Sequence, residues 1–281
     1  MSLLQQHWKT LSISLTDAIL TISMNRPKAN AMSPELLNEL IHAFNQASND
    51  NKIKGVLLRS NLRHTFVQWP NNFFQLRIFL LSSSTFSAGA DLSTVYNLSI
   101  ARQRAVIDNF VFETLSRGMT APLHCSKPVA CSVDGHTIAG GLMLALSCDY
   151  IAMGTRKPFR IGITGPIVGI PYPLKAVKLV QHQLEPQLGY RFLVDANLVS
   201  SNDFPIRCER SETPDDLARK WLKMISERPL KGFQITKQKW WSDVIELDSK
   251  DNEKEKQEYF EAVTSDECMQ AMKKALNKDT K

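Results

Sequence analysis

Long apolar runs are absent from this chain. A helix that crosses a bilayer needs about 20 consecutive apolar residues, and no stretch of the 281 residues approaches that length. The N-terminus passes almost directly into a strand pattern, without a signal or transit segment, and the chain does not end in a Ser-Lys-Leu peroxisomal address. These absences argue against a membrane-spanning protein and predict a mitochondrial or cytoplasmic location.

Paired cysteines are absent as well. The five cysteines are odd in number and scattered, and no two of them form a C-x-x-C pair: Cys125, Cys131, Cys148, Cys208 and Cys268. This usage argues for a reducing compartment and against a zinc site. We therefore expect no metal in this protein.

A nucleic-acid signature is the third absence. The net charge is +6, but the positive charge is spread along the chain. There is no basic cluster interleaved with aromatic residues and no known binding motif, so nucleic acid is not an expected partner. A modest positive surplus also suits a ligand that carries phosphates.

What the chain does have is an alternation of strand and helix patterns. Residues 11–24 alternate and then run apolar, with Asp17 at a turn, which predicts a hairpin. Ser33-Pro34-Glu35 is a strong helix start, because it offers an N-cap, a proline at the first helical position and an acidic first turn. A strand is predicted at 55–60 and a helix at 93–116. The apolar face of the first helix is expected to comprise Leu36, Leu40, Ala43, Phe44 and Ala47. This order predicts the α/β class.

The central stretch, residues 127–150, reads KPVACSVDGHTIAGGLMLALSCDY. Residues 128–133 predict a buried strand, 134–141 a turn that ends in a glycine pair, and 142–148 a buried helix. The start of a helix leaves backbone N–H groups free for an anion, and glycine allows a ligand to approach the backbone closely.

A second turn of small residues leads into a helix at 85–92, TFSAGADL. Two such turns can direct two N–H donors at one carbonyl oxygen, which would form an oxyanion hole. The competing interpretation is that Gly140 and Gly141 only allow the helix to pack tightly against its strand.

Three motifs together resemble a known family. NRPKANA at 25–31, SAGADL at 87–92 and DGHTIAGG…CDY at 134–150 are similar to the crotonase superfamily, also called the enoyl-CoA hydratase/isomerase family. IGITGPIVGIP at 161–171 is most similar to the delta-isomerase branch. The resemblance implies an α/β spiral of ββα units, with a core in residues 1–200 and a C-terminal helical trimerisation region in 201–281.

The implied ligand is an acyl-CoA thioester bound by a homotrimer, with no cofactor beyond the coenzyme A of the substrate. Its carbonyl oxygen would lie between the N–H groups of Ala90 and Gly140. The positions that match the family's substrate contacts are Lys28, Ala29, Ala88, Gly89, Asp91 and Leu92.

The chain departs from the family where the catalytic carboxylates are expected. Family hydratases hold water with two glutamates, and the position of the first is Met143 here. Isomerases use only the second, which falls on Gly165 here. The resemblance therefore implies an intact oxyanion hole without its base.

Four other residues are candidates for a substitute base. Asp91 usually has a structural role at a helix start. His136 can act as an acid or base near neutral pH, but a packing role is favoured. Tyr172 and Thr164 have ordinary pKa values that suit neither role.

Residues 61–81 interrupt the family pattern with an aromatic-rich segment that has no period of a helix or a strand. Three interpretations compete: a lid over the acyl site, a surface hairpin that contacts another subunit, or translated non-coding sequence. An exposed loop this apolar is an aggregation liability, which favours the last.

The expected function is that of an acyl-CoA-binding enoyl-CoA isomerase/hydratase that shifts a 3-enoyl-CoA double bond to the 2-position in fatty-acid β-oxidation, impaired by Gly165. The alternative is a catalytically silent acyl-CoA-binding or scaffold subunit.

Overall fold

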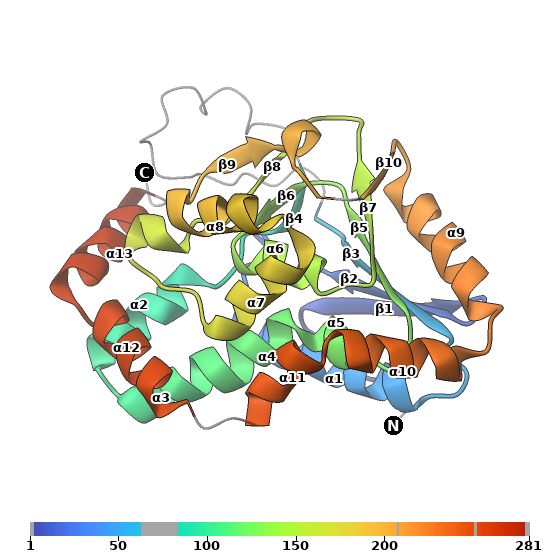
Figure 1. Ribbon diagram of the computed structural model, residues 1–281, viewed down its shortest axis with the longest axis horizontal. Helices are drawn as coiled ribbons and strands as arrows, with labels where there is room; N and C mark the ends of the chain where they lie inside the picture. Colours follow the sequence, from blue (N-terminus) through green and yellow to red (C-terminus); the bar gives the residue numbers. More distant parts are fainter. Residues whose placement is uncertain (1–2, 63–83, 207, 250–251, 279–281) are drawn as a thin grey trace.

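The computed structural model describes residues 3–62, 84–206, 208–249 and 252–278. Two sheets organise this part of the chain (Figure 1). The larger sheet has the strand order β1 (Leu11–Thr16), β2 (Ile19–Met24), β3 (Gly55–Ser60), β5 (Val129–Val133), β7 (Tyr150–Gly154), β10 (Glu209–Ser211). Only its β1–β2 pair is antiparallel.

The smaller sheet is built from short strands, the first three of which each follow a strand of the larger sheet in the chain. Its order is β4 (Thr85–Ser87), β6 (His136–Ile138), β8 (Arg160–Gly162), β9 (Leu198–Ser200). The last pair is antiparallel and the others are parallel. A predicted turn at 134–141 therefore contains a strand, because β6 pairs with β4 on one side and with β8 on the other.

Helices and single helical turns cover the sheets. They are α1 (Pro34–Asn49), α2 (Leu92–Ala101), α3 (Arg104–Asp108), the π-helix η1 (Asn109–Leu115), α4 (Ser116–Met119), α5 (Ala121–His124), α6 (Gly140–Leu146), the 3₁₀ turn η2 (Gly165–Val168), α7 (Leu174–Gln183), α8 (Pro186–Asp195), the 3₁₀ turn η3 (Ser201–Asp203), α9 (Pro214–Ser226), α10 (Leu230–Trp240), α11 (Ser242–Ile245), the 3₁₀ turn η4 (Glu246–Ser249), α12 (Glu253–Val263) and α13 (Asp266–Lys278). Among the described residues, no helix is both long enough and apolar enough to cross a bilayer.

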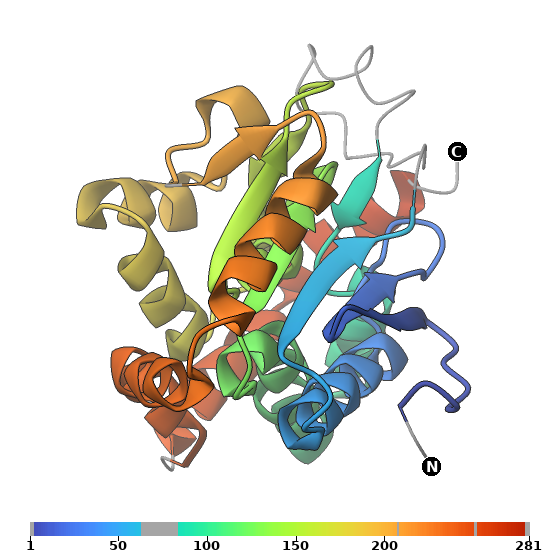
Figure 2. The same cartoon turned by 90° about the vertical axis from the view of Figure 1, so that its right-hand side faces the viewer.

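The central strands of the larger sheet, β2, β3 and β5, are buried on both faces. Helix α9 lies across one face (Figure 2), where Leu57 and Ala130 meet Ala218 and Leu222. Neighbouring strand residues point the opposite way, so Val56 joins the main core on the other face. Buried parallel strands of this kind confirm the predicted α/β class.

The first two predicted elements are confirmed. β1 and β2 form the hairpin, with Asp17 and Ala18 at φ 52° and 59° in its turn. Helix α1 begins at Pro34, and Ser33 Oγ accepts a hydrogen bond from Leu36 N at 3.3 Å. All five predicted core residues of this helix are buried.

The single helix predicted at 93–116 is wrong. Arg102, at φ 50°, ends α2, and the chain continues through α3 into the π-helix η1. A π-helix has more residues per turn, so the apolar stripe no longer follows the α-helical period. Val106, in α3 just before the π-helix, is 43% exposed.

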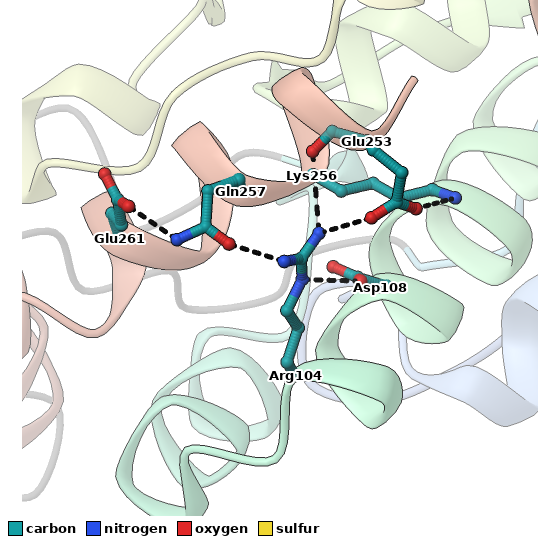
Figure 3. Close-up of polar contacts among 6 residues, drawn as sticks. All are labelled: Arg104, Asp108, Glu253, Lys256, Gln257 and Glu261. Carbon is teal, nitrogen blue, oxygen red and sulfur yellow. Dashed lines mark hydrogen bonds and ion pairs between the residues drawn. The ribbon is translucent and has the colours of Figure 1, made fainter. Parts of the chain in front are cut away.

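The two last helices, α12 and α13, pack against earlier elements of the chain. α12 contacts α3, and α13 contacts both α2 and η2 (Figure 1). Figure 3 shows Arg104 of α3 reaching α12, with its Nη2 2.8 Å from Glu253 Oε2 and its Nη1 2.5 Å from Gln257 Oε1. Its Nε donates to Asp108 Oδ2 on its own helix at 3.2 Å. The three interpretations of 61–81 fall almost entirely outside the described residues.

Candidate active site

Ala90 lies in a turn between β4 and α2 that is held by the loop before α1. Met32 N donates to Gly89 O at 2.7 Å, and Asp91 N donates to Met32 O at 3.2 Å. This is one parallel bridge between Met32 and Ala90. Since both bonds use the neighbours of Ala90, its own N–H points away from Met32.

Gly140 is the first residue of α6. Ala139, directly before it, has φ 49° and ψ −118°, a backbone conformation that a residue with a side chain rarely adopts. Ala139 N donates to Gly162 O at 2.8 Å, which fixes the turn onto β8. The N–H of a first helical residue has no partner within its helix, so the Gly140 N–H is available. The helix starts two residues earlier than predicted because Ala139, not the glycine pair, makes the turn.

The two turns touch at these two amides. A Cβ built on Gly140 would lie 3.5 Å from Ala90 N, and a Cβ built on Gly89 would lie 2.8 Å from Gly140 N. Gly89 has φ 85°, so glycine is required there for two reasons. Within the described part of the chain, neither Ala90 N nor Gly140 N donates a hydrogen bond.

The glycine pair has two separate roles in packing. A Cβ on Gly141 would lie 2.5 Å from Ser87 O, so this glycine lets α6 pack tightly against the end of β4. Gly140 instead faces two methionine sulfurs, with Met119 Sδ 2.8 Å and Met32 Sδ 3.1 Å from its built Cβ. The packing interpretation therefore accounts for Gly141.

Asp91 acts as the N-cap of α2. Its Oδ1 accepts hydrogen bonds from Ser93 N at 3.1 Å and Thr94 N at 3.3 Å, and its Oδ2 lies 2.7 Å from Arg26 Nη2. Burial raises the pKa of Asp91, but the Ser93 hydrogen bond and the Arg26 charge together hold it below the usual value. A carboxylate with these partners is a poor base, which supports the structural role.

His136 is buried in β6 and its ring is engaged. Nδ1 accepts a hydrogen bond from Arg160 N at 3.0 Å. Burial, followed by the charge of Arg160, lowers the pKa of His136 to about 4. The imidazole is therefore neutral near pH 7, and one nitrogen lone pair is already in use, which supports packing over catalysis.

The two positions predicted to match the family's carboxylates carry no acid. Met143 is buried in α6 at 1% exposure. Gly165 opens η2; its N–H donates to Tyr172 Oη at 3.2 Å, and its carbonyl accepts from Ile170 N at 3.0 Å. Burial raises the pKa of the Tyr172 phenol well above its usual value, so the phenol stays protonated. Thr164, just before Gly165, is buried.

The remaining predicted contacts converge on the same turn. Ala88 N donates to Ala29 O at 3.0 Å, which brings the 25–31 loop against the 87–92 turn, and Lys28 is exposed beside it. Leu92, half-buried, begins α2 directly after the Asp91 cap. The structure thus brings Ala29, Ala88 and Ala90 together in the turn that meets Gly140.

Asn30 holds the 25–31 loop against β4, and the sequence alone did not predict this role. It is fully buried at φ 48°, its Oδ1 accepts from Arg26 N at 2.8 Å, and its Nδ2 donates to Phe86 O at 3.0 Å. Ser87 Oγ donates to Asn30 O at 2.8 Å. The signal was present, because Asn30 lies within the motif at 25–31 and asparagine tolerates a positive φ.

The family assignment follows from sequence comparison. The profile of the enoyl-CoA hydratase/isomerase family matches residues 14–68 and 78–205, most of the chain. The chain belongs to the enoyl-CoA hydratase/isomerase family. The predicted resemblance to the crotonase superfamily is thereby confirmed.

Relatives in this family include both isomerases and hydratases. The chain is 28% identical over 156 residues to the mitochondrial enoyl-CoA delta isomerase 1 of Mus musculus, covering 55% of this chain and 45% of that protein. It is 27% identical over 134 residues to the short-chain-enoyl-CoA hydratase of Clostridium acetobutylicum, covering 47% and 41%. The chain thus spans less than half the length of these curated relatives.

Solved structures share the crotonase fold over nearly the whole chain. Human mitochondrial delta3-delta2-enoyl-CoA isomerase has a TM-score of 0.79 at 18% identity and covers 97% of this chain and 98% of its own. Enoyl-CoA hydratase from Bacillus halodurans has a TM-score of 0.76 at 19% identity and covers 94% and 99%. The predicted crotonase-like fold with a helical C-terminal region is confirmed.

This crotonase-fold chain also has a cavity of about 390 Å³ at the carboxyl ends of β3, β5 and β7. Among the described residues that line this cavity are both basic and acidic side chains, including Arg59, Arg156, Lys157 and Asp215. None of the predicted site residues is among them. No cluster of three or more potential metal-binding side chains occurs in the described ranges.

Proposed function

We propose that this chain binds an acyl-CoA thioester with the carbonyl oxygen between Ala90 N–H and Gly140 N–H, as an enoyl-CoA isomerase whose proton transfer is impaired. The reaction proposed is the shift of a 3-enoyl-CoA double bond to the 2-position. The observation that carries the proposal is the meeting of two backbone amides, each without a hydrogen-bond partner among the described residues.

A pair of amides is suited to this chemistry. Removal of a proton next to a thioester carbonyl moves negative charge onto its oxygen, and fixed N–H donors stabilise that charge without reorganising. Loss of one such donor typically costs about 3–4 kcal/mol of transition-state stabilisation. The Ala90 and Gly140 amides are fixed by the Met32 bridge and by the start of α6.

The rest of the proposed site agrees with a coenzyme A ester. Lys28 is exposed next to the Ala29–Ala88 contact, where a cation favours a phosphate-bearing ligand. The fatty-acid β-oxidation context and a homotrimer formed through 201–281 belong to the same proposal. Light scattering at several protein concentrations measures the assembly mass directly.

What limits turnover is the base. Isomerisation needs a group that takes a proton from one carbon and returns it to another, and a positioned base typically contributes about 10²–10⁴-fold. Met143 and Gly165 cannot do this, Asp91 is ion-paired, and His136 holds an amide hydrogen bond. These residues support the proposed impairment, and the second candidate function, acyl-CoA binding without turnover, follows if no group transfers the proton at all.

The test compares binding with turnover. The purified protein is incubated with a 3-enoyl-CoA, and formation of the 2-enoyl isomer is followed alongside a glutamate-bearing relative. Melting temperature is recorded with and without a saturated acyl-CoA, since a ligand bound to the native state raises it. We expect a clear thermal shift and turnover at least about 100-fold below the relative. Turnover equal to the relative's would overturn the impairment, and absence of any shift at millimolar acyl-CoA would overturn the thioester site.

A further inference from the structure

The segment after β8 folds into a closed turn around Gly165. Ile170 N donates to Gly165 O at 3.0 Å, and Gly169 N donates to Pro166 O at 3.1 Å. Tyr172 then returns to the start of the turn, where its Oη accepts the Gly165 N–H at 3.2 Å. The two ends of the segment are thus joined by both main chain and side chain.

A side chain at position 165 does not fit this turn. Its Cβ would lie 2.8 Å from Ile170 O, 2.9 Å from Tyr172 Cε2 and 3.2 Å from Tyr172 Cζ. Distances below about 3.0 Å require the neighbour to move, and Ile170 O is backbone in a residue whose N–H already closes the turn. The Tyr172 ring therefore stands in the direction that a residue-165 side chain would take.

The turn is also held from outside, so it has little freedom to relax. Gly169, at φ 76°, lies against Cys268 of α13, with 3.2 Å from its built Cβ to Cys268 Cβ. Cys268 Sγ donates to Val168 O at 3.0 Å. Pro171 and Pro173 on either side of Tyr172 fix their own φ angles.

We infer that Tyr172, rather than residue 165, decides whether this site transfers protons, because its ring holds the space in which a base would stand. This rests on the proposed function, in which position 165 is that of the missing carboxylate. The phenol is half-buried, and its raised pKa keeps it protonated, so it fills the space without acting as a base at neutral pH. A carboxylate at 165 would break the turn, whereas one at 172 takes the place of the ring and keeps the Gly165 N–H as a donor.

The step expected of the Tyr172→Glu variant is a proton shuttle. The carboxylate takes a proton from C2 of a 3-enoyl-CoA, and the C2–H bonding pair forms the C2=C3 double bond. In the intermediate, the negative charge lies on the thioester oxygen. The electron pair of the former C3=C4 double bond then takes the proton from the carboxylic acid at C4. No atom is gained or lost, and the carboxylate is regenerated.

The experiment compares wild type with three variants: Tyr172→Glu, its uncharged match Tyr172→Gln, and Gly165→Glu. For each, 3-enoyl-CoA isomerisation and the thermal shift with a saturated acyl-CoA are measured. Tyr172→Glu is expected to exceed both wild type and Tyr172→Gln by at least about tenfold, within the range of a positioned base. Its rate should rise with pH through one ionisation, while Gly165→Glu melts lower than wild type and gains nothing.

Two results overturn the inference while leaving the thioester site intact. One is a Tyr172→Glu protein that binds acyl-CoA but turns over no faster than Tyr172→Gln. The other is a Gly165→Glu protein that gains activity at unchanged melting temperature. If wild type shows no acyl-CoA shift, the proposed function fails instead, and the inference fails with it.

A further variant covers the case in which Tyr172→Glu does not fold. Tyr172→Ala removes the ring and leaves room for formate as an external carboxylate. Turnover that rises and saturates with added formate supports the inference. No rise with formate, in a folded protein that still binds acyl-CoA, contradicts it.

Discussion

At the residue scale, the candidate site depends on backbone that side chains would obstruct. Gly89 combines φ 85° with three neighbours 2.8 Å from its built Cβ: Ala139 Cβ, Gly140 N and Ile138 O. Two of these are main-chain atoms, so they cannot rotate away. Gly232 in α10 is the opposite case, since nothing lies within 4 Å of its built Cβ.

Gly89→Ala is therefore expected to destabilise the protein by about 2–4 kcal/mol, from the left-handed backbone and from overpacking. It should also remove the melting shift with acyl-CoA, because it separates the two amides. Gly232→Ala serves as the control and should be neutral or stabilising by up to about 1 kcal/mol. Urea denaturation measures both, and equal effects of the two substitutions would contradict the proposed geometry.

His136 is expected to make the stability of the protein depend on pH. Its pKa is about 4 in the folded protein and 6.5 in the unfolded chain. Between these values the unfolded chain binds the extra proton, so the free energy of unfolding falls as pH drops from about 6.5 to 4, by at most about 3 kcal/mol. His136→Asn retains an acceptor for Arg160 N but does not titrate, and its stability profile should be flatter over that window. An unchanged slope would show that other groups cause it.

At the element scale, a buried ion pair fixes helix α10 to the starts of two central strands. Lys237 Nζ lies 2.7 Å from Asp149 Oδ2 and donates to Pro122 O at 2.8 Å. Asp149 Oδ2 also accepts from Val129 N at 2.8 Å, directly at the start of β5. Burial raises the pKa of Asp149, although the Lys237 charge opposes this, so the carboxylate depends on its partner.

Lys237→Met is expected to destabilise the protein by about 3–5 kcal/mol, because it leaves a buried carboxylate without its cation. Adding Asp149→Asn should recover much of that loss, since an amide oxygen still accepts from Val129 N and carries no charge. Chemical denaturation of the two single variants and the double variant gives the coupling energy. Simple additivity in this cycle would argue against the ion pair as the cause.

At the scale of the whole molecule, the C-terminal helices pack against elements that adjoin the candidate site. α13 touches both α2, which starts after Ala90, and η2, which starts at Gly165. Arg104 joins α12 to α3 through the contacts in Figure 3. A movement of α13 would therefore displace both the start of α2, next to Ala90, and the turn at Gly165.

Arg104→Gln is expected to lower the stability by about 1 kcal/mol, as for a partly exposed charge network. Its larger effect should be local, with faster hydrogen exchange in 252–278 than in the sheet. Arg117→Gln is the matched control, because within the described ranges Arg117 pairs with one exposed side chain, Glu113, at 3.4 Å. Exchange that rises equally throughout the chain, or equally in both variants, would contradict a docking role for Arg104.

Local signals in the sequence determined the hairpin, the start of α1, the central strand and the two small-residue turns. Each depends on neighbouring residues, such as Asp17 at φ 52° or Ser33 capping Leu36 N. The interruption of the helix at 93–116 could not be predicted from the sequence, because a π-helix leaves no local signature and Arg102 is an ordinary helix former.

The sequence alone was enough to match the family motifs and to predict the two amides and the absence of a carboxylate at Met143 and Gly165. Only the tertiary structure decided why Gly165 stays a glycine: Ile170 O and the Tyr172 ring occupy the space around it, and α13 holds that turn. Such crowding depends on atoms that come together only when the chain closes on itself. A sequence motif shows which residue is present at a position, whereas the packing of the folded chain determines which other residues would fit there.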